Sequence, residues 1–488
     1  MHCDANIKIG RFSHSSMYFL KQQIRNLLAS TTATRIYRRL LRRTPQLQEI
    51  LGVCLYYYRK HAIRNAASLM QKAREMPATK KVGSQGHQLL IDISGLVCRH
   101  DQTGVYRVVF NLLQKIQQSP PDGFSIEPIY ADSAGLLRYA YTYTQQLRTG
   151  AMDDSADPVV TVQPGDLFFS ADLHFPYPFA VLRSLKSHGL RVVFTVHDMI
   201  PLSYPQYFMK LTKLGLQEWL SSAVNVADGI ICVSRSVADE LHALILEHPE
   251  YRKAPLPIGY FHHGADLAND PPIVNISASE QKAFAACKMR PTFLMVGTVV
   301  PYKGHSQALS AIELLWKIGI DCNLMVVGRE GWRVQGFVDK FNRSTERNRR
   351  LFWLKETGDG MLTSLYTTAS CLIAASFTEG FGLPLIEAAR HGLPIIARDI
   401  PVFREVAGSH AFYFQGESPE ALSKAIQEWL ALNASDKAPS SLNMPWQTWQ
   451  ESAAQLLQII INNNWYIANA TAYGNARDDA CLTEKATT

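Results

Sequence analysis

The chain contains two series of short, continuous apolar runs, and a loop and a stretch of helical spacing follow each run. Strands of a parallel sheet that is covered on both faces are apolar on both sides, so they appear as unbroken apolar runs. The repeated order of strand, loop and helix predicts two doubly wound parallel sheets. The runs of the first series are QLLIDIS, DLFFS, RVVFTVHD and GIICVS, and those of the second are TFLMVG, NLMVVG, LFWL, CLIAA and PIIARD.

The length of 488 residues supports two domains, because one hydrophobic core organises at most about 250–300 residues. We therefore predict an α/β protein in which two Rossmann-like domains face a cleft. The predicted parts are a basic helical extension (1–86), a first Rossmann-like domain (87–270), a second (271–444), a closing helix that packs back on the first domain (445–468) and a flexible tail (469–488).

Three local patterns refine this division. The Pro- and Gly-rich segment 254–277 is expected to connect the domains. Ser236 and Asp239 have the spacing of a capping box, which predicts a helix start after the fourth strand. The closing helix is expected to place five apolar residues on one buried face. These residues are Trp446, Trp449, Ala453, Leu456 and Ile460.

Positive charge is concentrated at one end of the chain. Residues 1–86 hold 16 Lys/Arg and 3 Asp/Glu, whereas the remainder holds 33 and 39. This segment has near-helical apolar spacing broken at Pro45, which predicts two basic amphipathic helices. Such helices can lie on an anionic membrane surface, or they can form a solvated appendage or an oligomerisation arm. Binding to nucleic acid is not expected, because no recognition motif is present and the remainder is acidic.

Several sequence features predict a cytoplasmic protein without a metal centre. The eight cysteines are scattered singly, with no C-x-x-C pair and no zinc spacing. No signal peptide and no stretch of about 18 apolar residues is present, so neither export nor membrane spanning is expected. The chain contains no D-x-D string, and its Asp, Glu and His residues form no metal-binding pattern. We expect no cofactor.

The string EGFGLPLIEAARHGLPIIARD carries the strongest functional signal. Its glycine loop follows a buried strand and enters a helix, with Pro384 suited to the first turn. Backbone N–H groups at such a helix start favour an anion or a sugar hydroxyl. Glu379 and Glu387 flank the loop eight residues apart, and because carboxylates repel phosphate, neutral sugar hydroxyls suit them better. The alternative is a glycine turn with two solvated glutamates.

This string resembles the E-x7-E signature of retaining GT-B glycosyltransferases of family 4, and the resemblance extends over residues 87–465. GTVVPYKGHSQAL is similar to the family's G-x-x-x-P-R-K-G segment, VFREV to the stretch after its next strand, and WQESA to its closing helix. TGVYRVVFNLL and HDMIPL resemble the subgroup that builds bacterial surface polysaccharides such as O-antigen or capsule, many of whose members transfer mannose or rhamnose.

The resemblance implies a donor site in the second domain. Glu387 would bind the ribose hydroxyls of the donor nucleotide, Glu379 the donor sugar near its 3-hydroxyl, and Lys303 the diphosphate. A fixed cation would stabilise the charge that the leaving diphosphate gains in the transition state. Tyr302 stands where the family usually has arginine, and Arg329 is one candidate for the missing positive charge. The loop residues that complete the donor site are Gly380, Phe381, Gly382 and Leu383.

The resemblance also implies contacts from the first domain. Gly104 would lie in a loop that approaches the donor phosphate or the acceptor, and Arg107 would add positive charge there. His197 ends a strand at the carboxyl edge of the sheet, where open parallel sheets bind ligands, and would contact the transferred sugar. Asp198 would orient the loop or the acceptor, and Ser234 lies near the same cleft. The alternative for His197 and Asp198 is a strand-end cap.

The predicted reaction is metal-independent transfer of a sugar with retention of anomeric configuration. The best single expectation is mannose from GDP-mannose, with a dTDP-rhamnose or UDP-sugar donor as the alternative. The acceptor would be a glycan or a lipid-linked glycan, which suits a basic arm on the cytoplasmic face of the inner membrane. The alternative of another class is a non-catalytic scaffold that binds nucleotide sugar in a glycan-assembly complex.

Overall fold

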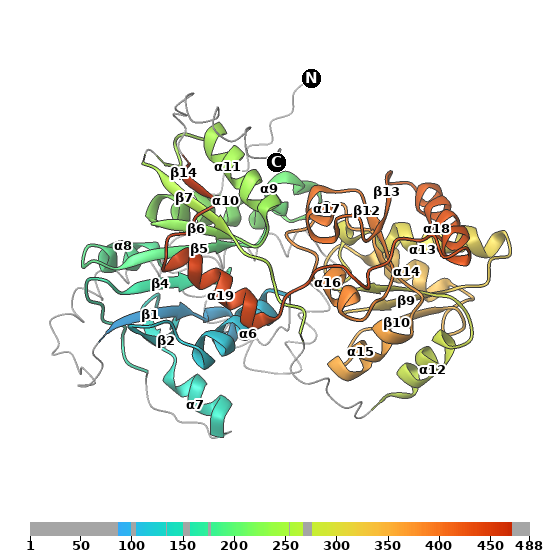
Figure 1. The fold of residues 1–488 in the computed structure, drawn as a ribbon, viewed down its shortest axis with the longest axis horizontal. Helices are drawn as coiled ribbons and strands as arrows, with labels where there is room; N and C mark the ends of the chain where they lie inside the picture. Colours follow the sequence, from blue (N-terminus) through green and yellow to red (C-terminus); the bar gives the residue numbers. More distant parts are fainter. Residues whose placement is uncertain are drawn as a thin grey trace, which may run out of the picture.

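The computed structural model describes residues 86–98, 104–132, 134–149, 157–173, 177–252, 254–266 and 276–470. The basic helices predicted within 1–86 lie outside these residues, as does nearly all of the predicted tail. The described chain forms two lobes, each built on one sheet (Figure 1).

The first lobe contains an eight-stranded sheet with the strand order β14-β7-β6-β5-β4-β1-β2-β3. Its central strands pair in parallel, and β3 and β14 are the antiparallel strands. The strands are β1 (His87–Asp92), β2 (Phe124–Ala131), β3 (Leu137–Tyr139), β4 (Leu167–Ser170), β5 (Arg191–Val196), β6 (Gly229–Cys232), β7 (Leu256–Tyr260) and β14 (Ile467–Ala470).

Helices cover this sheet and connect its strands (Figure 1). They are α5 (Ser94–Cys98), α6 (Gly104–Gln118), α7 (Tyr141–Thr149), α8 (Phe179–Lys186), α9 (Ile200–Ser203), the 3-10 helix η1 (Pro205–Tyr207), α10 (Lys210–Val226), α11 (Arg235–Glu247) and the closing helix α19 (Trp449–Ile460). The middle strands β4 and β6 are buried along their full length, which explains their continuous apolar sequences.

The second lobe contains a six-stranded parallel sheet with the order β10-β9-β8-β11-β12-β13. Its strands are β8 (Thr292–Val296), β9 (Asn323–Val327), β10 (Leu351–Leu354), β11 (Cys371–Ala374), β12 (Ile395–Arg398) and β13 (Phe412–Phe414). Its helices are α12 (Ala278–Cys287), η2 (Pro301–Lys303), α13 (His305–Lys317), α14 (Gln335–Arg343), α15 (Asp359–Thr368), α16 (Leu383–Arg390), α17 (Pro401–Ala407) and α18 (Pro419–Ala434).

All nine predicted apolar runs form strands, but the segment expected to connect the domains does so only in part. Residues 256–260 of that segment form β7, a strand inside the first sheet. Gly259 has a structural reason there, because a Cβ at this position would lie 2.7 Å from Cγ2 of Ile459 on α19. The glycine therefore marks close packing of the closing helix and not a turn.

The predicted helix cap after the fourth strand is wrong by two residues. The N-cap of α11 is Ser234, whose extended backbone places its Oγ to accept from the N–H of Val237 at 3.2 Å. Ser236 lies inside the helix, and the spacing of Ser236 and Asp239 is coincidental. The prediction took the later of two serines that follow β6.

The closing helix α19 returns from the second lobe and packs against α6 of the first (Figure 1). Thr448 and Glu451 form its capping box, so Trp446 precedes the helix and is 41% exposed, contrary to its predicted place on the buried face. The chain then continues into β14, which pairs with β7 through Ala470. The predicted flexible tail therefore begins too early, because residues 469 and 470 belong to β14.

Candidate functional site

The glycine loop between β11 and α16 lies against the carboxyl end of β5 in the other lobe. A Cβ at Gly380 would lie 2.0 Å from the carbonyl oxygen of His197, so only glycine permits this approach of the two backbones. Gly382 is the N-cap of α16 with φ +101, a left-handed conformation that favours glycine. These glycines bring the E-x7-E segment to the boundary between the domains.

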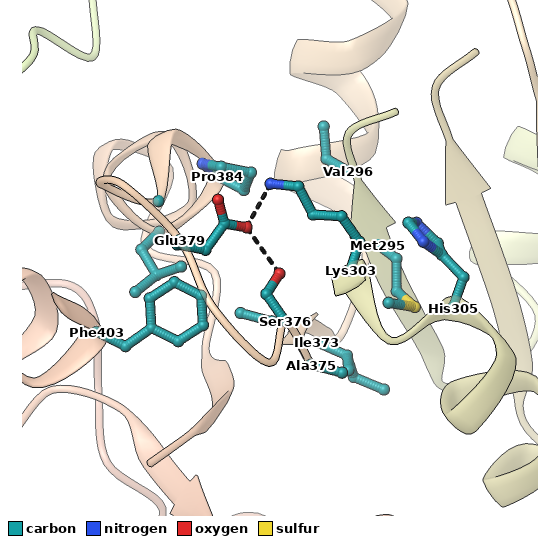
Figure 2. Close-up of a pocket in the computed structure, with 13 residues that line it drawn as sticks. Met295, Val296, Lys303, His305, Ile373, Ala375, Ser376, Glu379, Pro384 and Phe403 are labelled. Carbon is teal, nitrogen blue, oxygen red and sulfur yellow. Dashed lines mark hydrogen bonds and ion pairs between the residues drawn. The ribbon is translucent and has the colours of Figure 1, made fainter. Parts of the chain in front are cut away.

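Glu379 lies beside Lys303 at a small pocket in the second lobe (Figure 2). Its Oε1 accepts from Nζ of Lys303 and, at 2.7 Å, from Oγ of Ser376. The two charged side chains are 11% and 19% exposed. The lysine and the serine fix the carboxylate, and the other lone pairs of its oxygens are available to hydroxyl donors.

Lys303 is held by a tight turn at the start of α13. Gly304 has φ +75, and a Cβ there would lie 2.3 Å from the carbonyl oxygen of Ala375. The next residue, His305, is buried. Burial, with a smaller contribution from the positive charge of Lys303, lowers the pKa of His305 to about 3, so its imidazole is neutral. Lys303 therefore supplies the positive charge of this turn.

Glu387 lies one turn into α16, and both of its oxygens have partners. Nη1 of Arg107 on α6 donates to Oε1 at 2.5 Å, and the hydroxyl of Tyr366 donates to Oε2 at 2.6 Å. Arg107 also lies 3.5 Å from Asp359. The negative charge of Glu387 is the largest cause of the raised pKa of Arg107. Glu387 is therefore an oriented carboxylate at the interface between the lobes.

His197 and Asp198 form the opposing wall at the end of β5. Nε2 of His197 donates to the carbonyl of Ala171 at 2.7 Å, and burial lowers the pKa of this imidazole. Burial raises the pKa of Asp198 to about 6, against the opposing hydrogen bond from the N–H of Ile200. The negative charge of Glu379 across the boundary adds to this rise. Asp198 is thus a carboxyl group that changes its charge near neutral pH.

Further bonds between the lobes position this wall. Oγ of Ser234 donates to the carbonyl of Gly380 at 2.7 Å. Glu405 of α17 accepts from the N–H groups of Arg235 and Ser236 at 2.7 and 2.8 Å, and from Nε2 of His262 at 2.8 Å. Burial opposes ionisation of Glu405, but these donors outweigh it and lower its pKa to about 2. The carboxylate of Glu405 therefore satisfies the N-terminus of α11 from the other lobe.

Tyr302, at the expected arginine position, packs among aromatic rings. Its ring stacks on Phe208 with centroids 5.7 Å apart, and Nζ of Lys303 lies 6.0 Å from its centroid. Arg329 is exposed, and among the contacts of the described residues none joins its side chain to this site. Arg107 forms ion pairs with Glu387 and Asp359, so it is a better candidate than Arg329 for the missing positive charge.

The structure brings most of the predicted residues to one boundary. Gly104 joins them as the first residue of α6, where a Cβ would lie 3.8 Å from Leu383. The prediction missed the residues that hold these side chains and the domain boundary through hydrogen bonds and ion pairs. They are Ser376, Tyr366, Asp359, His262 and Glu405. The contact of VFREV with the start of α11 could not be read from spacing, because the two segments are about 170 residues apart.

Neither a metal centre nor a membrane-spanning helix is found in the described part of the chain. Within residues 86–470, apart from the gaps given above, no group of three or more His, Cys, Asp or Glu side chains is arranged to hold a metal ion. None of the helices in the same residues has both the length and the hydrophobicity that crossing a bilayer requires.

Comparison with known proteins finds a match to a glycosyltransferase family in each lobe. Residues 166–250 match Glycosyltransferase Family 4, and residues 277–442 match the family described as glycosyl transferases group 1. The chain is 40% identical over 376 residues to the serotype-specific mannosyltransferase WbdA of Escherichia coli. This match covers 76% of the chain and 44% of WbdA, so the matched part of the chain spans less than half the length of this relative.

Solved structures agree on the fold. Sucrose-phosphate synthase from Thermosynechococcus elongatus superposes with a TM-score of 0.54 at 15% identity, covering 76% of this chain and 98% of that one. The catalytic domain of starch synthase IV from Arabidopsis thaliana gives 0.51 at 13% identity, covering 78% and 99%. The chain therefore has the GT-B fold, with a match to Glycosyltransferase Family 4 in its first lobe and a match to glycosyl transferases group 1 in its second.

Proposed function

We propose that this protein transfers mannose from GDP-mannose to a glycan or lipid-linked glycan acceptor in the synthesis of a bacterial O-antigen. The observation that carries the proposal is the pair of oriented carboxylates, Glu379 with Lys303 and Glu387 with Arg107, on a loop and helix that contact the facing domain. The identity of 40% to a mannosyltransferase supports the choice of sugar.

The proposed donor pose follows from charge. Lys303 would leave Glu379 to bind the diphosphate, because the diphosphate of a nucleotide sugar carries two negative charges and a carboxylate carries one. Glu379 would then accept from a sugar hydroxyl. Glu387 can accept from ribose hydroxyls without losing Arg107 or Tyr366, because each carboxylate oxygen has two lone-pair positions. Arg107 would stay near the nucleotide and offset the negative charges of Glu387 and Asp359.

The proposed acceptor side is the first domain. His197 and Asp198 face the donor loop, so an acceptor hydroxyl placed between them and Glu379 would reach the anomeric carbon. We propose that the departing diphosphate, held by Lys303, receives the proton of the acceptor hydroxyl, and that the anomeric configuration is retained. No metal is required in this scheme, because Lys303 supplies a cation at the leaving group.

A donor panel tests the proposal. GDP-mannose, GDP-fucose, dTDP-rhamnose, UDP-glucose and UDP-N-acetylglucosamine are compared in thermal shift and hydrolysis with the wild type and with Glu387→Ala. The expected result is stabilisation and hydrolysis with GDP-mannose in the wild type alone. NMR of the product with an added mannoside acceptor then reports the anomeric configuration. Stabilisation and hydrolysis with another donor would replace GDP-mannose as the proposed donor. A product with inverted anomeric configuration would exclude the retaining mechanism.

The scaffold alternative makes a different prediction in the same panel. A non-catalytic scaffold would be stabilised by a nucleotide sugar and would neither hydrolyse nor transfer it. The raised pKa of Asp198 at the domain boundary favours catalysis, because carboxyl groups with strongly shifted pKa values concentrate at active sites.

A further inference from the structure

Six aromatic rings from both domains form a continuous surface beside the donor site. We call this set the aromatic surface, and its members are Tyr204, Tyr207, Phe208, Tyr302, Trp332 and Phe377. The rings of Tyr204 and Tyr207, and those of Tyr207 and Phe377, are nearly parallel, with centroids 6.2 Å apart in each pair. Phe208 contacts Trp332 at 5.5 Å. The rings thus bridge η1 of the first domain and η2 of the second.

A hydrogen-bonded clamp fixes this surface. Nε1 of Trp332 donates to the carbonyl of Tyr207 at 3.0 Å, and Nη1 of Arg333 donates to the carbonyls of Gln206 and Phe208 at 2.9 and 2.8 Å. Arg333 has φ +55, a left-handed conformation that is unfavourable for a residue with a Cβ. Such conformations persist where surrounding contacts hold them, and they concentrate at binding sites.

The aromatic surface continues directly from the proposed transfer point. Tyr302 precedes Lys303 in the sequence, and the N–H of Phe377, two residues before Glu379, donates to the carbonyl of Tyr302 at 2.8 Å. On the opposite side, the chain runs from Asp198 through the short helix α9 into η1. A ligand that reaches from the donor sugar along this wall would therefore pass over the rings.

Five of the six rings are at least partly exposed, whereas Phe208 is buried beneath them. Trp332 is 41% exposed, and Tyr204 and Tyr207 are half-buried. A pyranose ring has an apolar C–H face and a rim of hydroxyls, and aromatic side chains with polar tips suit such amphipathic ligands. An acyl chain would instead favour an aliphatic groove. The chemistry of the surface therefore indicates carbohydrate.

We propose that the aromatic surface binds sugar residues of the acceptor glycan behind the residue that receives the transferred sugar. This inference rests on the proposed function, because the acceptor is taken to be a glycan. Trp332 is its central contact, since it is the most exposed ring of the set. Its indole N–H is bonded to the carbonyl of Tyr207, and its ring contacts Phe208 and Tyr302. The surface spans both domains, so bound acceptor would also favour their closed arrangement.

The test compares three variants of the full chain. Trp332→Ala removes the ring, Trp332→Phe keeps an aromatic face without the indole N–H, and Trp446→Ala removes a tryptophan that is equally exposed, at 41%, but lies before α19. Initial rates are measured with α-mannobiose, α-mannotriose and α-mannotetraose carrying a fluorescent aglycone. Binding of the same oligosaccharides without donor is followed by saturation-transfer NMR.

The expected result is a rise of about tenfold in acceptor KM for Trp332→Ala with the longer oligosaccharides. Donor KM should change by less than about threefold, Trp332→Phe should keep most of the affinity, and Trp446→Ala should behave as wild type. The inference would be overturned by equal acceptor KM in wild type and Trp332→Ala, if thermal unfolding shows that both proteins are folded. Equal rises in donor and acceptor KM would also overturn it, because the rings would then serve the donor.

The failure of the proposed function is distinguishable from failure of this inference. If the wild type neither hydrolyses nor transfers any nucleotide sugar, the proposed function fails, and the NMR experiment still decides whether the rings bind mannose oligosaccharides. Saturation transfer that disappears in Trp332→Ala and persists in Trp446→Ala supports the surface. Saturation transfer of equal strength in wild type and all variants contradicts the inference.

Discussion

At the residue scale, each carboxylate of the E-x7-E segment is prepared by partners from a different element. Glu379 is held by Lys303 and Ser376 of its own domain, whereas Glu387 is held by Arg107 of the other domain and by Tyr366. The two glutamates therefore differ in what their removal should do. In the proposed function Glu379 contacts the donor sugar and acts in the reaction, whereas Glu387 acts in donor binding and also contacts the other domain through Arg107.

Replacing Glu379 by glutamine should lower kcat more than it changes binding. We expect a fall in kcat of at least about tenfold with less than about threefold change in donor KM, because an oriented carboxylate at the sugar acts mainly on the reacting geometry. Steady-state kinetics with GDP-mannose measure both. A large rise in donor KM at unchanged kcat would show that Glu379 serves only ground-state binding.

Asp198 predicts an acid limb in the pH profile. Its folded pKa of about 6 lies above the ordinary 3.8, so it carries a proton below about pH 6 and ionises above it. If the ionised form orients the acceptor, kcat/KM should fall as pH drops through about 6, and Asp198→Asn should remove this limb. Ionisation of Asp198 in the folded protein should also lower the free energy of unfolding as pH rises through about 6. A wild-type limb that persists in Asp198→Asn would exclude this role.

At the element scale, the sequence predicts strands better than it predicts how they are joined. The buried parallel strands β4, β6 and β9 are continuous apolar runs, so their pattern identifies them. The shorter or less apolar strands β2, β3, β7, β13 and β14 were missed. Residues 124–131 include Glu127 and Pro128, and β13 has three residues, so neither stands out from a loop.

The site, like the fold, could be predicted only where a local sequence pattern identifies it. The glycine loop and Glu379, Glu387 and Lys303 form local motifs whose residue types indicate their chemistry. The partners Tyr366 and Glu405 meet their targets through tertiary contacts, which no local pattern encodes. The substitution at Tyr302 was visible in the sequence, but its place in an aromatic surface depends on rings from both domains.

Gly380→Ala should separate the two elements that meet at the glycine loop. The added Cβ would lie 2.0 Å from the carbonyl of His197, so β11–α16 and the end of β5 must move apart. We expect a loss of at least about tenfold in kcat/KM, since misplacement by about 1 Å can cost on the order of 100-fold. Gly336→Ala is the matched control, because a Cβ added there would meet no other atom within 4 Å. Equal activity of both variants would contradict the close approach.

At the scale of the whole molecule, ion pairs and hydrogen bonds hold the domains together around the site. Glu405 makes one of these contacts, and its folded pKa of about 2 lies below the ordinary 4.5. The contact should therefore stabilise the closed arrangement fully above about pH 4.5 and lose this contribution as pH falls toward about 2. Thermal unfolding from pH 7 to pH 3 should show a smaller acid loss in Glu405→Gln than in wild type. Parallel curves would exclude Glu405 as a contributor.

The basic segment 1–86 adds a separate prediction at this scale. If it binds an anionic membrane surface, deleting residues 1–80 should reduce sedimentation with anionic vesicles and spare turnover of soluble donor. Each basic residue near such a surface contributes about 1 kcal/mol at low salt, so the effect should weaken as salt rises. Equal vesicle binding of the truncated and intact chains would reject the membrane arm.

The E-x7-E segment and Lys303 should together bind a nucleotide-sugar donor, and calorimetric titration tests this assignment most directly. GDP-mannose is titrated into the wild type, Glu387→Ala, Lys303→Met and the exposed-helix control Glu428→Ala. We predict one binding site in the wild type, affinity lowered by about 10- to 100-fold in Glu387→Ala and Lys303→Met, and unchanged affinity in Glu428→Ala. Equal affinity in all four proteins would contradict the assignment of the donor site.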